Sequence, residues 1–162
     1  MRTHEKGSAV IEMALVFIPL MFSIFSLFEL TRAMWTYHTL ASSVKKAVRV
    51  AIVHGARCAE ASNDCPVTIG GLIQTIQQSG VGIDISLLQL TFTSTSDTVT
   101  CNPASTCSTN DTQWPPSSGN AVGQSITING KYGFNSVLKA LWPGQATGTI
   151  NLAAKSTEVI QF

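Results

Sequence analysis

The sequence predicts an α+β fold in which a long N-terminal membrane-spanning helix packs on a small antiparallel sheet of three or four strands. An apolar run at residues 8–28 predicts the membrane span, and a helical spacing of apolar residues continues the helix through residues 29–54. Short stretches of alternating apolar and polar residues predict strands within residues 55–162. Residues 1–7 form a polar leader, and the part after the helix is long enough for one small globular domain.

The apolar run at residues 8–28 has the length of a transmembrane helix. It contains about 21 residues, and an α-helix needs about 20 to cross a hydrocarbon layer of about 30 Å. Apolar side chains surround this helix on every side, so its natural surroundings are lipid or a tightly packed bundle. Pro19 removes one backbone hydrogen bond inside the run and is expected to kink or loosen the helix there.

Glu12, the one carboxylate inside the run, is the first candidate functional residue. At the centre of a span a carboxylate costs roughly 2.5–3.5 kcal/mol, but a cut between Gly7 and Ser8 would place Glu12 only about 6 Å from a new N-terminus. The new α-amino group could pair with Glu12 in the same helix or in the next subunit. At about 4 Å and an effective dielectric of about 20 this attraction is about 4 kcal/mol before desolvation, enough to set the register of two helices.

These residues resemble the cleavage signal of type IV pilin-like proteins. Gly7 is followed by Ser8-Ala9-Val10-Ile11-Glu12 and an apolar helix, and proteins of this class are cut after the glycine by a prepilin peptidase and carry glutamate as the fifth mature residue. The closest resemblance is to the TadE-like pseudopilins of the tight-adherence (Flp, type IVb) pilus system. It is carried by KGSAVIEMALVFIPLMFSIFSLFELTRAMW, in which Pro19, Glu29 and Arg32 occupy the family's usual places.

The resemblance implies a pilin-like fold and a minor pseudopilin that acts in pilus assembly and is not an enzyme. It assigns Gly7 and Ser8 to peptidase cleavage and Glu12 to helix registration. The implied partners are the prepilin peptidase, other pseudopilins, the major pilin and the inner membrane, with no cofactor, no metal and no nucleic acid. Pro19 is then either a tolerated transmembrane proline or a point where the helix melts during assembly. A plain signal anchor, with Glu12 lying by chance at the membrane surface, is the alternative.

The charges give no separate indication of a partner or of orientation. The net charge is +1 and only 12% of residues are charged, so no basic excess points to nucleic acid. Basic residues lie on both sides of the span, at Arg2 and Lys6 and again at Arg32, Lys45 and Lys46. The resemblance and the cysteines therefore set the orientation: a single-pass protein of the inner membrane with a cytoplasmic N-terminus and a C-terminal domain in the periplasm or in the pilus.

Four cysteines fall as two close pairs. Three connectivities are possible, and the short polar loop inside each pair favours Cys58–Cys65 and Cys101–Cys107. Each disulfide would contribute about 2–3 kcal/mol and would require an oxidising compartment. The alternative is a metal site, although neither spacing is that of a zinc module.

Residues 29–54 are expected to form an amphipathic helix that stands outside the membrane as a spine. With the span it would be about 70 Å long and would end at Gly55. The apolar stripe consists of Ala33, Tyr37, Leu40, Val44, Ala47, Val48 and Ala51. The polar face consists of Arg32, Thr36, Thr39, Ser43 and Lys46.

The C-terminal domain is expected to combine short helices with strands. The predicted elements are a helix at 68–79, a strand at 83–95, a long stapled loop at 94–120, a strand at 122–132, a helix from Asn135 to Ala140 and a strand at 149–162. Gly70-Gly71 argues against a helix that begins as early as residue 68, because glycine has a low helix propensity. Trp35, Tyr37 and Trp114 fit a membrane-interface belt or the core better than a ligand cage.

No catalytic motif accompanies this organisation. His4, His38 and His54 have no acidic residue at a metal or triad spacing, and neither a nucleophile elbow nor a phosphate loop occurs. Two other classes of function stay open. One is a membrane-anchored surface adhesin or binding module that uses the Ser/Thr-rich loop 94–120, and the other is a bitopic protein with an unrecognised enzymatic domain.

Overall fold

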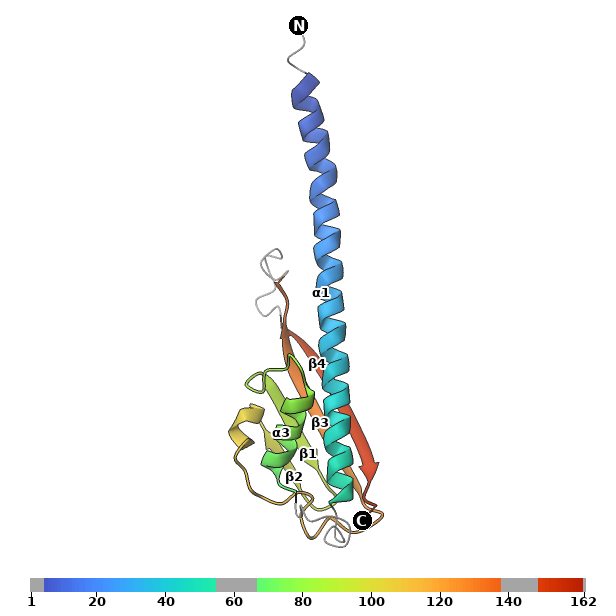
Figure 1. Cartoon of the computed structure of the whole chain (residues 1–162), viewed down its shortest axis with the longest axis vertical. Helices are drawn as coiled ribbons and strands as arrows, with labels where there is room; N and C mark the ends of the chain where they lie inside the picture. The colour runs from blue at the N-terminus through green and yellow to red at the C-terminus, as the bar shows by residue number, and fades with distance from the viewer. Residues whose placement is uncertain (1–4, 55–66, 138–148, 162) are drawn as a thin grey trace.

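The computed structural model describes residues 5–54, 67–137 and 149–161. A single long helix, α1 (Glu5–Val53, 49 residues), includes both the predicted span and the predicted spine, and the other elements gather against its C-terminal half (Figure 1). With a four-stranded antiparallel sheet, this confirms the predicted α+β class. The helix continues through Pro19 and ends at Val53, while the stop expected at Gly55 lies outside the described residues.

The two halves of α1 differ in their surroundings. Every described side chain from Ala9 to Leu20 is exposed, whereas the C-terminal half is inserted into the core. The core residues of this half with no exposed surface are Leu40, Val44, Ala47, Val48 and Ala51. The predicted apolar stripe is therefore confirmed from Leu40 to its last member, Ala51.

The predicted boundary between the two faces of the spine is wrong at three positions. Thr36 and Ser43 are buried, whereas Tyr37 is 40% exposed. The two hydroxyl groups can be buried because they donate to carbonyl oxygens of their own helix, Thr36 Oγ1 to Arg32 O at 2.9 Å and Ser43 Oγ to Leu40 O at 3.0 Å.

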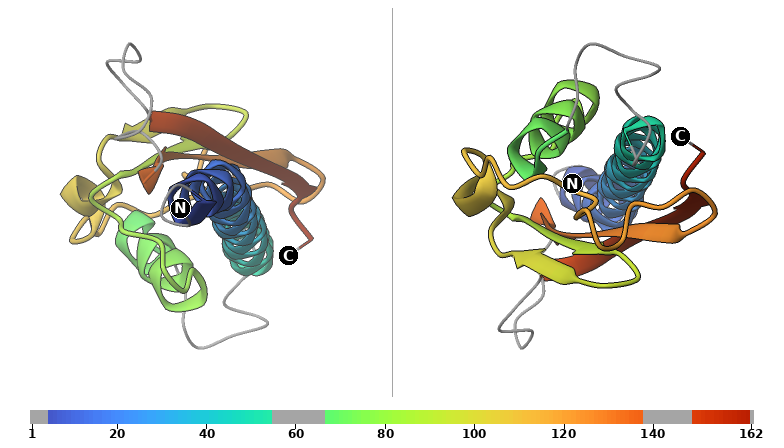
Figure 2. Two further views of the ribbon diagram at one scale, coloured as in Figure 1. Left: turned by 90° about the horizontal axis from the view of Figure 1, so that it is seen from above. Right: turned by 90° about the horizontal axis from the view of Figure 1, so that it is seen from below.

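The sheet has the order β2-β1-β3-β4, with every neighbouring pair antiparallel. Its strands are β1 (Leu88–Thr93), β2 (Thr98–Cys101), β3 (Ser125–Asn135) and β4 (Thr149–Val159). Helix α1 and the shorter helix α3 (Ile69–Ser79) lie on one face of the sheet (Figure 2). The alternation predicted for the first strand is confirmed, because Leu88, Leu90 and Phe92 are all completely buried.

Helix α3 confirms the element predicted at 68–79, and its neighbours explain the first of the two glycines at its start. Thr68 caps the helix by accepting a hydrogen bond from Gly71 N at 3.1 Å. Gly70 N donates to Asn110 O at 2.9 Å, and a Cβ atom on Gly70 would lie 2.8 Å from Ser108 O. Only glycine allows this close approach, so its packing role overrides its low helix propensity.

The prediction of a continuous loop at 94–120 is wrong in part. This stretch contains strand β2 and the 3-10 helix η1 (Ala104–Cys107), which the Cys101–Cys107 disulfide joins. Strand β2 is four residues long and is stabilised by pairing with β1, which a local pattern does not reveal. The other predicted pair, Cys58–Cys65, lies outside the described residues.

Several strand ends also differ from the prediction. Strand β1 begins at Leu88 rather than at residue 83, because Asp84 organises a turn before it. The Asp84 carboxylate accepts hydrogen bonds from Ser86 Oγ at 2.7 Å and Ser86 N at 2.8 Å, which lower the pKa of Asp84. Strand β3 begins at Ser125, so Val122 precedes it.

In the C-terminal part of the domain, the last strand agrees with the prediction, whereas Asn135, where a helix was expected to begin, does not. Asn135 is the last residue of β3 rather than a helix cap, and most of the helix expected through Ala140 lies outside the described residues. Strand β4 confirms the last predicted strand, and Leu152 and Ala154 face α1 while their neighbours are exposed.

Trp114 is a core residue. It is 1% exposed, and its ring meets the ring of Phe92 edge to face with centroids 5.3 Å apart. Of the two roles expected for Trp114, in a membrane-interface belt or in the core, the core role is therefore the correct one. Trp114 thus belongs to the fold and offers no exposed surface to a ligand.

Candidate functional site on the N-terminal helix

The exposed half of α1 is an apolar surface with one carboxylate. Within the described part of the chain, Ala9–Val53 is the one helix long and apolar enough to cross a membrane, with a mean hydropathy of 2.3 in its most apolar window. This helix fits a membrane anchor. Glu12 is the only charged residue between Ala9 and Phe28.

Glu12 lies one helical turn after Ser8, the arrangement that the spacing predicts. The backbone of Gly7 and Ser8 already belongs to α1. Ala9, Met13 and Val16 surround Glu12 on the helix surface. Glu12 has no hydrogen bond or ion pair with any described residue. The carboxylate is therefore available to a group outside this chain.

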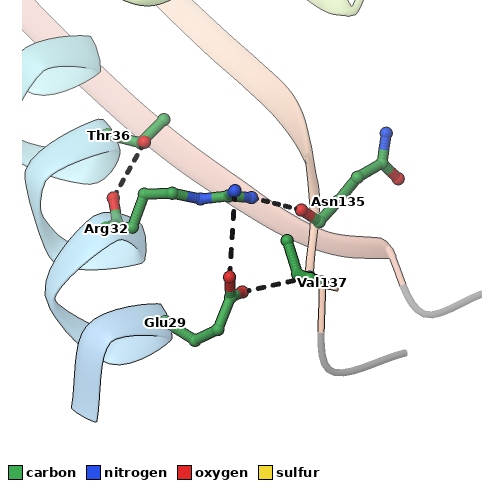
Figure 3. A network of polar contacts seen from close by, with 5 residues as sticks. All are labelled: Glu29, Arg32, Thr36, Asn135 and Val137. Carbon is green, nitrogen blue, oxygen red and sulfur yellow. Dashed lines mark hydrogen bonds and ion pairs between the residues drawn. The ribbon is translucent and has the colours of Figure 1, made fainter. Parts of the chain in front are cut away.

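A second polar site lies where the exposed half of α1 meets the end of the β3–β4 hairpin (Figure 3). Glu29 Oε2 accepts a hydrogen bond from Val137 N at 3.3 Å, and Glu29 Oε1 lies 3.8 Å from Arg32 Nη1. Arg32 donates to Asn135 O and stacks over the Phe134 ring at 4.5 Å from its centroid. We call Glu29, Arg32, Phe134, Asn135 and Val137 the helix–hairpin junction.

The junction joins α1 to the head, by which we mean the sheet, α3, η1 and the C-terminal half of α1 that packs with them. Its ion pair is partly exposed, with Arg32 at 48% and Glu29 at 15%, so the pair itself contributes at most about 1 kcal/mol. The stacking on Phe134 adds about 0.5–1 kcal/mol. The hydrogen bonds to Val137 and Asn135 make the contact specific in its geometry, because each joins a charged side chain to a particular backbone group.

The sequence indicates only half of this junction. Glu29 and Arg32 stand at usual family positions, but no residue near them in the sequence indicates their partners. The partners are 103 and 108 residues away along the chain, and two of the three contacts are to backbone atoms, which no sequence pattern encodes. The aromatic contact of Arg32 with Phe134 was equally hidden.

Arg32→Ala is expected to lower the free energy of unfolding of the head by about 1–2 kcal/mol, because it removes the stacking, the hydrogen bond to Asn135 O and the ion pair. Hydrogen exchange at the end of β3 should accelerate in the same variant. Lys46→Ala is the control, since Lys46 is exposed and has no partner among the described residues. Equal stability and equal exchange in the two variants would show that the junction does not hold the head.

Comparison with known proteins agrees with the features of α1. Residues 7–49 match the family model described as TadE-like protein. The match begins at Gly7 and includes Glu12, both helical residues of the junction and most of the spine. Neither a curated protein nor a solved structure matches the chain. The resemblance read from the N-terminal residues is thus confirmed: the chain carries a TadE-like helix, which connects it with Tad pilus systems.

Proposed function

We propose that the protein is a minor pseudopilin of a tight-adherence pilus, which acts in pilus assembly after a prepilin peptidase has removed residues 1–7. The observation that carries the proposal is an exposed apolar helix with one carboxylate five residues after Gly7, within a TadE-like segment. An apolar surface of this size is stable only in lipid or against other apolar helices. Helix–helix and domain contacts, rather than catalysis, are then the protein's activity.

Glu12 has a specific part in this proposal. It faces outward among apolar side chains, so its charge raises the free energy of the helix in lipid, and pairing with a cationic partner offsets that cost. Cleavage after Gly7 supplies that partner as the α-amino group of Ser8 on a neighbouring subunit. The pair exists at only one axial offset between the two helices, so it selects one register from many that apolar packing alone would allow.

The proposed location is the inner membrane, with the head in the periplasm. The Cys101–Cys107 disulfide supports an oxidising compartment for the head. A single span then leaves Gly7 and Ser8 on the cytoplasmic side, where the peptidase would act. Other pseudopilins and the major pilin are the proposed partners of the exposed helix.

Gly7→Leu tests the proposal. This variant is expected to insert in the membrane at full length, to resist the co-expressed peptidase and to give no pili, because the amine that pairs with Glu12 never forms. Ser8→Ala is the matched control and should be processed and assembled normally, since alanine is similar in size and leaves the new amine in place. Gel mobility measures processing and electron microscopy counts pili. Normal piliation by uncut Gly7→Leu protein would contradict the proposal.

A further inference from the structure

The last described residues of β3 and those just after it lie at the level where the apolar run of α1 stops. Val137 N donates to the carboxylate of Glu29 at 3.3 Å, and Glu29 directly follows Phe28, the last residue of the run. Helical side chains lean toward the helix N-terminus, so the carboxylate of Glu29 is displaced toward the span rather than away from it. Figure 1 shows the hairpin rising along α1 beyond the rest of the head.

Exposed apolar side chains collect at this end of the head. Val137 is 67% exposed, and Ile150, which pairs with Phe134 in the sheet, is 52% exposed. On α1 itself Leu30 is 61% and Trp35 is 66% exposed. We call these four residues the hairpin-end surface. Among the residues that the structure describes, the cation bonded to this hairpin is Arg32, which Glu29 and Asn135 already engage, so none of their charges is left unpaired against lipid.

We propose that the hairpin-end surface docks into the headgroup layer of the same bilayer that α1 spans. The inference rests on the membrane anchoring in the proposed function. The headgroup layer is about 5–7 Å thick on each side of the hydrocarbon. Glu29 and Arg32 lie about 1.5–6 Å beyond Phe28 along the helix, and the hairpin residues bonded to them lie close to the same height.

Helix tilt does not remove the hairpin from this layer. Spans tilt by about 20° on average, and packed elements lie about 10 Å apart, so tilt changes the height of the hairpin by only about 3 Å. Trp35 lies about 10 Å past Phe28, and its side chain leans back toward the membrane, where indole rings are favoured. The head then has two attachments, the span and the hairpin end, which together hold it in one orientation above the bilayer.

Quenching of tryptophan fluorescence by lipid tests the inference. The full chain is placed in phosphatidylcholine vesicles whose acyl chains are brominated near the headgroup, with Trp35 and Trp142 replaced by phenylalanine. Trp114 stays as a constant buried background. One reporter tryptophan is then introduced in turn by Val137→Trp, Ile150→Trp, Val122→Trp or Phe22→Trp.

Val122 is the matched control because it is 52% exposed, like Ile150, but lies at the opposite end of the head. Next to it, Gly123 N donates to Ile160 O, and Gln161 N donates to Ile52 O, about 36 Å beyond Phe28 along α1. Phe22→Trp reports the span itself.

The inference predicts strong quenching of Phe22→Trp, quenching of Val137→Trp and Ile150→Trp at least about half as strong, and none for Val122→Trp. Quenching of Phe22→Trp, with both hairpin reporters no more quenched than Val122→Trp, would overturn the inference and leave the proposed function intact. An unquenched Phe22→Trp would overturn the membrane anchoring on which both depend.

Discussion

Glu12→Ala is expected to reduce pilus assembly by about tenfold or more while membrane insertion and leader cleavage stay normal. The attraction between a carboxylate and an α-amino group is about 4 kcal/mol at 4 Å before desolvation, and even a third of it changes an association constant about tenfold. Insertion should not suffer, since removing a charge makes the span more apolar. Electron microscopy and immunoblotting of sheared pili measure assembly, and gel mobility measures cleavage.

Met13→Ala is the control for the Glu12 variant. Met13 neighbours Glu12, is 73% exposed and carries no charge, so its truncation removes surface but no ion pair. Glu12→Gln separates charge from shape and should behave like Glu12→Ala. Assembly at the level of the unsubstituted protein in both Glu12 variants would contradict the registering role.

The second large effect is expected at Gly130, where side chains of α1 pack directly on the backbone of β3. A Cβ atom on this residue of β3 would lie 3.1 Å from Val44 Cγ2 and 3.3 Å from Leu40 Cδ1, both on the buried face of the spine. Gly130→Val must therefore push α1 away from β3 or displace two fully buried side chains. We expect a loss of about 3 kcal/mol in the free energy of unfolding, measured by urea denaturation of the detergent-solubilised chain.

Gly133→Val provides a matched control in the same strand. Gly133 lies on the opposite face of β3, and a Cβ atom there would meet only the Thr149 methyl group, at 3.3 Å. Its substitution should change stability by less than about 1 kcal/mol, because valine suits a strand and the neighbouring side chain can move. Equal losses in the two variants would show that the effect is one of strand glycines in general and not of the contact between spine and sheet.

Periodicity made α1, α3 and most of the sheet predictable. The helical spacing of Leu40, Val44 and Ala51 and the alternation of Leu88, Leu90 and Phe92 each report a face that must be buried. Patterns of this kind locate an element and its buried side but not its neighbour. Thr36 and Ser43 were wrongly placed on the exposed face, because a hydroxyl group that is hydrogen-bonded within its own helix can be buried at little cost.

Features that depend on distant pairing were not predictable. Strand β2 has only Val99 as a large aliphatic residue and exists because β1 supplies its hydrogen-bonding partner. The partners of Glu29 and Arg32 come from the far end of the chain and act mainly through backbone atoms. The placement of Gly7, Ser8 and Glu12 on one helix was predictable for the opposite reason, because all three residues lie within two turns of each other.

The mass of the membrane-resident protein tests the proposed function most directly. Intact-protein mass spectrometry of the chain purified from membranes that contain the peptidase should give a molecule that begins at Ser8. The same spectrum should show Cys101 and Cys107 oxidised. A working pilus machine whose copy of this protein still carries Met1 to Gly7 would contradict the proposal, because Glu12 would then have no new amine to pair with.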